Sequence, residues 1–179
     1  MTNQLRTRIP ISPALVIAAS LLVCVVCPAP AAAQEITAEA LAEFVPETLA
    51  GADRWKDPAI SHIEVPNQQK ASVTQYYLGE PGGTLEIIYG DPEWGLFDAA
   101  VQRTARGAER RAKTGGRDEA VTVSGFDACL VVSSTTTFVL VDVNEAILVR
   151  VQVSAGQMAE ATIAAAEAMD LQGLASLLE

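Results

Sequence analysis

The residues best suited to bind a charged group form a basic cluster between positions 103 and 117. Four of them lie at steps of three, four and three residues: Arg103, Arg106, Arg110 and Lys113. In a helix, these steps place the side chains on one face. We therefore predict an anion-binding face for phosphate groups or an acidic partner.

The same basic residues have a purely structural alternative. An amphipathic helix needs a polar face toward water, and charge runs on helices commonly supply it. The opposite side of the predicted helix is apolar and consists of Phe97, Val101, Ala105, Ala108 and Ala112. The sequence leaves both interpretations open, because each requires the same helix with its basic side exposed.

Aromatic residues and carboxylates suggest a second candidate site. Trp94 lies next to Asp91 and Glu93, and Tyr76 lies in a predicted strand. We include Trp94 and Tyr76 among the candidate binding residues, because aromatic side chains commonly line ligand pockets. Paired acids could instead do hydrolytic chemistry, with the single histidine, His62, as a third member. The structural alternative is that Asp91 caps the helix that Pro92 begins.

No residue pattern in the chain indicates a metal or a cofactor. A lone histidine cannot form a histidine-rich metal site, and no cysteine lies at ligand spacing from His62. The glycines at 79, 82 and 83 do not have the spacing of a phosphate-binding loop. The sequence assigns no catalytic residue. Cys129 lies in an apolar run and is expected to be a buried thiol.

The N-terminus has the three parts of a secretory signal peptide. Arg6 and Arg8 precede an apolar stretch of 13 residues, 14–26, that is interrupted only by Ser20. Small residues at 31–33 then provide a cleavage site. The apolar stretch is too short for a spanning helix, which needs about 20 residues. We predict that residues 1–33 are removed, that no membrane span remains, and that the mature protein is periplasmic or extracellular.

Composition predicts one acidic domain over residues 34–179. Signal cleavage removes two arginines and no acid, so the formal net charge changes from −10 to −12. Such a charge opposes binding to nucleic acid through the overall field. Cys129 is the only cysteine left after cleavage, so an intrachain disulfide is excluded.

The fold prediction is α+β, with an antiparallel sheet of six or seven strands and two or three helices. Strands are expected near 60–65, 71–78, 84–89, 121–123, 128–133, 136–143 and 146–153. Helices are expected near 37–45, 93–113 and 157–169, with a last short turn after Asp170. Short turns between successive strands favour antiparallel pairing.

The C-terminal third resembles the PsbP-like α/β/α sandwiches, a family that includes exported bacterial domains. The similar features are the segment 121–125, the strand end 148–151 and the final helix leading to 169–171. The resemblance implies a binding or assembly factor more than an enzyme.

The sequence therefore predicts an exported, non-enzymatic binding or interaction domain. Its partner would be a protein or a small ligand of the cell envelope. Two alternatives stay open, namely a hydrolase with a carboxylate site and an accessory subunit of an envelope complex.

Overall fold

The structure, a computed structural model, describes residues 36–62, 70–156 and 158–179. The predicted signal peptide, residues 1–33, lies outside the described residues. The described chain forms one antiparallel sheet with the strand order β1-β2-β3-β4-β8-β7-β6-β5. The eight strands are β1 (Thr48–Leu49), β2 (Ala52–His62), β3 (Ala71–Leu78), β4 (Gly83–Tyr89), β5 (Arg117–Val123), β6 (Phe126–Val132), β7 (Thr137–Val143) and β8 (Ile147–Val153).

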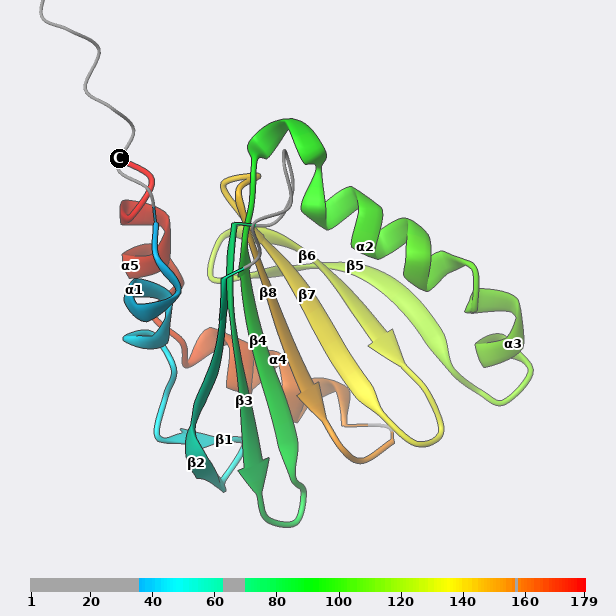
Figure 1. Cartoon of the computed structure of the whole chain (residues 1–179). Coiled ribbons are helices and arrows are strands. Elements are labelled where there is room, and N and C mark those ends of the chain that lie inside the picture. The colour runs from blue at the N-terminus through cyan, green and yellow to red at the C-terminus, as the bar shows by residue number, and fades with distance from the viewer. Residues whose placement is uncertain (1–35, 63–69, 157) are drawn as a thin grey trace, which may run out of the picture. The chain divides into compact units, whose positions relative to one another are not determined.

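Helices lie on both faces of this strongly twisted sheet (Figure 1). The helical elements are α1 (Ala38–Ala42), the 3₁₀ helix η1 (Pro92–Trp94), α2 (Leu96–Ala105), α3 (Ala108–Ala112), α4 (Ala159–Glu167) and α5 (Leu171–Ser176). Residues of α1, α4 and α5 pack in the main core on one face. Residues of α2 pack in a smaller cluster on the other face, which we call the groove face.

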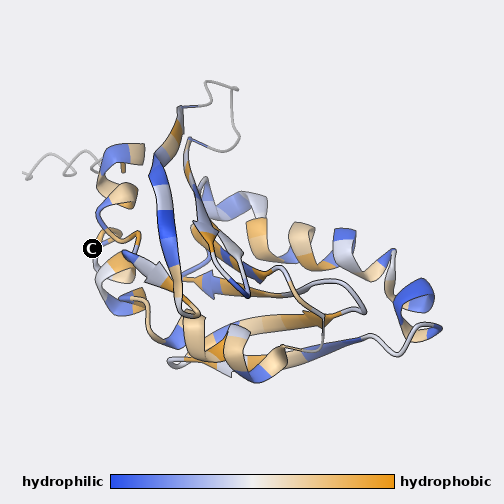
Figure 2. Cartoon of the chain, turned by 90° about the horizontal axis from the view of Figure 1, so that it is seen from below, coloured by the Kyte–Doolittle hydropathy of each residue, from blue (hydrophilic) through white to orange (hydrophobic). Residues whose placement is uncertain are grey.

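The main core follows from strict alternation along the strands. In β8, Ile147, Val149, Val151 and Val153 are all buried, while Arg150 and Gln152 point to the groove face and are half-buried. Alternation with a period of two places every second side chain on the same face. The apolar face of the sheet is therefore continuous across neighbouring strands, and Figure 2 shows the hydrophobic colour on most of them.

The groove face has its own small apolar cluster. Leu96, Phe97, Ala100 and Val101 of α2 pack against a set of buried sheet residues. Those sheet residues are Cys129, Val131, Leu140 and Leu148. This contact fixes the apolar side of α2 on the sheet. The basic residue of α2, Arg103, lies outside this apolar cluster.

Residues with positive φ angles form the connections before and after β5. The β5–β6 connection is the dipeptide Ser124-Gly125, with φ of 50° and 91°. Positive φ at both central residues matches the right-handed twist of the paired strands. Gly115, at φ 79°, likewise allows the chain to reverse after α3 and enter β5.

The α+β class, the antiparallel sheet and the hairpin of β3 with β4 are confirmed. The expected counts are low, because the sheet has eight strands and the described chain has five α-helices. The additional strand, β1, has two residues and no distinctive pattern. The predicted helix 93–113 is divided into η1, α2 and α3 by Gly95 and Gly107.

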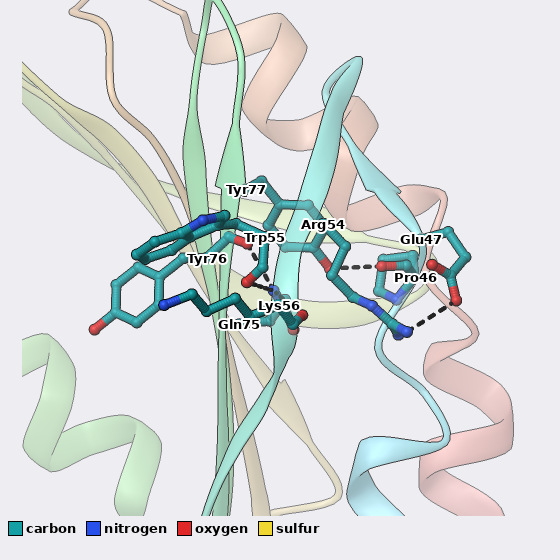
Figure 3. A network of polar contacts seen from close by, with 8 residues as sticks. All are labelled: Pro46, Glu47, Arg54, Trp55, Lys56, Gln75, Tyr76 and Tyr77. Carbon is teal, nitrogen blue, oxygen red and sulfur yellow. Dashed lines mark hydrogen bonds and ion pairs between the residues drawn. The ribbon is translucent and has the colours of Figure 1, made fainter.

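Tyr77 ties the main core to the chain before β1. Its hydroxyl donates to the backbone oxygen of Pro46 at 2.8 Å, and the side chain is buried (Figure 3). Burial raises the pKa of Tyr77 well above its ordinary value of 10.0. The folded chain therefore favours the neutral phenol, whereas the unfolded chain ionises this residue above about pH 10.

We expect Tyr77→Phe to lower the free energy of unfolding by about 1 kcal/mol at neutral pH, because one hydrogen bond is lost. The stabilisation from the raised pKa is complete below pH 10 and decreases as the pH rises above it. Urea denaturation between pH 8 and about pH 11 should therefore show a flatter decline for Tyr77→Phe than for the natural chain. Parallel declines would contradict this assignment.

In the part of the chain that the structure describes, no helix combines the length and the apolar character needed to cross a membrane.

Candidate anion-binding groove

A groove of about 800 Å³ lies between α2, α3 and the groove face of the sheet. We call it the arginine groove, because five of its lining residues are arginines. Its lining consists of Glu86, Ile88, Ala100, Arg103, Thr104, Arg106, Gly107, Arg110, Arg111, Phe138, Leu140, Leu148 and Arg150. The floor comes from β4, β7 and β8 and is apolar except for Glu86 and Arg150, whereas the other four arginines come from the α2–α3 segment.

Two separate elements bring their cations to the same space. Arg103, Arg106 and Arg110 come from the α2–α3 segment, and Arg150 comes from the middle of β8. Arg150 reaches the groove because its neighbours Val149 and Val151 point into the main core. The convergence is therefore a product of tertiary structure, since about 40 residues separate Arg150 from the helical arginines.

Arg150 is held in place by contacts on several sides. Its guanidinium carbon lies 4.8 Å from the ring centroid of Phe138, a cation–π distance. Nη2 donates to Oε1 of Gln152 at 2.8 Å, and Nη1 lies 3.9 Å from Oε2 of Glu86. The Nε–H is buried and has no acceptor among the described residues. Arg150 thus keeps donor capacity that the protein itself does not use.

Arg111 connects α3 to both of its neighbours. It donates from Nε to Oδ1 of Asp118 at 2.9 Å, and from Nη2 to Oδ2 of the same carboxylate and to the backbone oxygen of Thr104. This two-pronged geometry is the strong form of an arginine–carboxylate pair. It fixes α3 over β5 beside the arginine groove.

The other helical arginines are uncompensated within the described chain. Of the ion pairs among residues 36–62, 70–156 and 158–179, none includes Arg103, Arg106 or Arg110. The groove lining holds five arginines and one carboxylate, that of Glu86. This local excess of positive charge is notable on a chain whose formal net charge is −10, and it favours anions at this position.

A second hollow of about 340 Å³ adjoins the arginine groove and shares Arg110, Arg111 and Phe138 with it. Its other walls carry hydroxyl groups of Thr114 and of the β6–β7 loop, residues 133–136. Hydroxyls and arginines together can donate to the oxygens of an oxyanion. The positively charged surface is therefore extended, with Arg110 and Arg111 at its centre.

The structure separates the predicted binding residues into two groups. Arg103, Arg106 and Arg110 line the arginine groove. Lys113, at the C-terminus of α3, is exposed and lines neither hollow. Trp94 in η1 and Tyr76 in β3 are exposed and lie outside both linings.

The candidate hydrolase residues have other structural partners. The Asp91 carboxylate accepts from the backbone N–H of Glu93 at 3.1 Å, which is the N-cap role. His62 lies at the end of β2, where its Nε2 is 3.2 Å from Oε1 of Glu39 in α1. No hydrogen bond or ion pair within the described ranges links His62 to Asp91 or Glu93.

Cys129 is free and buried on the groove face, as the sequence predicts. Burial raises the pKa of the thiol, with a further increase from Asp118 that Arg111 opposes. Among the described residues there is no cluster of three or more histidine, cysteine, aspartate or glutamate side chains that could hold a metal ion.

Sequence reasoning missed Arg150, Phe138 and Glu86 as groove residues. Each is an outward-facing position in an alternating strand, and that alternation was readable. What the pattern could not indicate was which outward residues lie beneath α2 and α3.

The chain is therefore an α+β protein with helices on both faces of its sheet and a groove lined by arginines between the sheet and the α2–α3 segment. Comparisons with protein-family models, with curated proteins and with solved structures found no match.

Proposed function

We propose that this chain is an exported binding protein that holds an anionic ligand in the arginine groove. The observation that carries this proposal is the convergence of Arg150 from the sheet with Arg103, Arg106 and Arg110 from the helices on one groove. A volume of about 800 Å³ suits a small molecule or one segment of a larger ligand.

The type of cation narrows the ligand class. All five basic residues of the lining are arginines, and none is a lysine. The planar guanidinium presents donors that match the two oxygens of a carboxylate or phosphate. We therefore favour an oxyanion that several guanidinium groups bind at once, above an apolar floor formed by Ile88, Leu140 and Leu148.

Binding is better supported than catalysis at this site. The lining contains one carboxylate, Glu86, and no histidine or cysteine. Its one hydroxyl, that of Thr104, donates to the backbone oxygen of Ala100 at 2.8 Å. General acid–base hydrolysis by paired acids would need a second carboxyl across the groove. A binding role also agrees with the implication of the PsbP-like resemblance.

Export to the periplasm or the cell exterior is part of the same proposal. It is supported by the basic start, the short apolar stretch and the small residues at 31–33 of the printed sequence. The N-terminal sequence of the protein recovered outside the cytoplasm should begin at Gln34. A retained Met1 in that fraction would overturn the cleavage.

We expect Arg103→Glu combined with Arg110→Glu to weaken binding of inorganic phosphate at least tenfold. Each charge-assisted hydrogen bond contributes about 1.5–3 kcal/mol, and every 1.4 kcal/mol corresponds to about tenfold in affinity. Titration calorimetry of the purified protein at constant ionic strength measures this effect. Arg150→Gln should weaken phosphate binding as well, because it removes the cation that the sheet contributes to the groove.

The matched control is Lys113→Glu, compared with the single groove variant Arg110→Glu, because each reverses one charge on the same helical segment and Lys113 lies outside the groove lining. Its phosphate affinity should fall less than that of the Arg110 variant, because Lys113 is exposed and contributes to neither lining. Equal weakening by the control and by the groove variant would show that only the overall charge matters. Absence of phosphate binding by the natural chain would also overturn the proposal.

A further inference from the structure

The strand register places a row of side chains across the groove face of the sheet. Trp55 is paired with Tyr76, Tyr76 with Thr84, Thr84 with Gln152, and Gln152 with Phe138. Directly paired residues point to the same face of a sheet. Strands are spaced by about 4.8 Å, so the row extends about 19 Å from Trp55 to Phe138 in the arginine groove.

The outer half of this row is open. The main contacts of α2 are with β6, β7 and β8 and those of α3 are with β5, whereas α1 packs on β2 and β3 from the main-core face. Trp55 and Tyr76 are 45% and 51% exposed. In Figure 3 both project to the side opposite Tyr77 and Arg54. The arginine groove therefore continues into an uncovered aromatic surface on β2 and β3.

The row has aromatic side chains at both ends and two hydrogen-bonding side chains between them. Tyr76 offers its ring faces, and Trp55 offers the indole face that Lys56 does not cover. The negative quadrupole of such a face attracts the weakly positive C–H groups on the face of a sugar ring. Thr84 and Gln152, between the aromatics and Phe138, can donate and accept hydrogen bonds. An acyl chain would desolvate these two polar side chains without pairing them. A sugar, whose hydroxyls can pair with them, suits this surface better.

Positive charge is present at both ends of the row. The arginine groove lies at the Phe138 end, and Lys56 lies at the other, with its Nζ 4.4 Å from the centroid of the Trp55 indole. A ligand that spans the row would therefore meet cations at two well-separated points. This arrangement fits a chain with repeated negative charges.

We propose that this face binds a short stretch of an anionic polysaccharide. A carboxylate- or sulfate-bearing sugar occupies the arginine groove, and the following sugars extend over Gln152 and Thr84 to Tyr76 and Trp55. This inference rests on the proposed function, because the arginines provide the first subsite. Single-stranded nucleic acid would also stack on aromatic residues, so it is included below as a competing probe.

Calorimetry with five probes tests the row. The probes are inorganic phosphate, galacturonate, tetragalacturonate, a chondroitin sulfate tetrasaccharide and oligothymidylate. We expect at least one of the tetrasaccharides to bind ten times more tightly than galacturonate. Trp55→Ala combined with Tyr76→Ala should remove most of that advantage and leave phosphate affinity within twofold. Both aromatic side chains are exposed, so the variant should remain folded.

Trp94→Ala is the matched control, since it removes an exposed tryptophan that is not part of the row. It should leave tetrasaccharide affinity unchanged. If the natural chain binds phosphate but binds neither tetrasaccharide more tightly than galacturonate, this inference alone is overturned. If the natural chain binds no phosphate, the proposed function is overturned. Tighter binding of oligothymidylate than of either tetrasaccharide, or an unchanged affinity in the Trp55/Tyr76 variant, would also overturn the polysaccharide assignment.

Discussion

Ile87→Ala should lower the free energy of unfolding by about 2–5 kcal/mol, the usual cost of truncating a large core side chain. Ile87 lies in the middle of β4, and its cross-strand neighbours are Val73 in β3 and Val149 in β8. All three have an exposed fraction of 0%. Removal of the side chain therefore leaves a cavity between two fully packed strands, which the surrounding sheet can fill only in part.

Urea denaturation of the natural chain and the variant measures this loss. Ile60→Ala is the matched control, because Ile60 is 42% exposed in β2, two strands away from β4. The same chemical change there should cost less than about 1 kcal/mol. Equal losses at the two positions would contradict the burial that the structure assigns to Ile87.

Arg111→Ala should have the second largest effect, a loss of about 1–3 kcal/mol of unfolding free energy. The substitution leaves the Asp118 carboxylate without its guanidinium partner and removes the donor to the backbone oxygen of Thr104. The side chains of Arg111 and Asp118 are only 17% and 21% exposed, so water replaces the lost contacts incompletely. Phosphate affinity should fall as well, because α3 loses its attachment to β5.

Arg117→Ala provides the comparison for this pair. Arg117 contacts Glu119 at 2.6 Å, but the two side chains are 48% and 45% exposed. Exposed ion pairs contribute about 0–1 kcal/mol, so this variant should be nearly as stable as the natural chain. If the Arg117 variant lost as much stability as the Arg111 variant, burial would not explain the importance of the Arg111–Asp118 pair.

Several local elements were predictable from the sequence because their causes are local. Thr37 and Asp170 accept hydrogen bonds from the backbone N–H groups of Ala40 and Gly173, as N-cap residues do. The alternation in β8 identified its buried face. Each of these features depends only on residues that are close in the sequence, so the sequence pattern is enough to predict it.

Helix lengths were less predictable. The basic and apolar stripes between 93 and 113 fit one long helix, yet the helix is interrupted at Gly107. That interruption lets Arg111 reach Asp118 in β5, a contact between two elements whose placement depends on the whole sheet. Helical periodicity alone does not report such a tertiary contact.

The candidate site also has a part that the sequence predicts and a part that depends on tertiary structure. The sequence by itself determined that Arg103, Arg106 and Arg110 share one side of a helical segment, because helical spacing is a local property. Only the tertiary structure decided that this side faces Arg150 and Phe138 across a groove, and that Lys113 lies outside it. The physical reason is that α2 packs on β7 and β8 through long-range apolar contacts, and these contacts set which outward-facing strand residues lie beneath the helix.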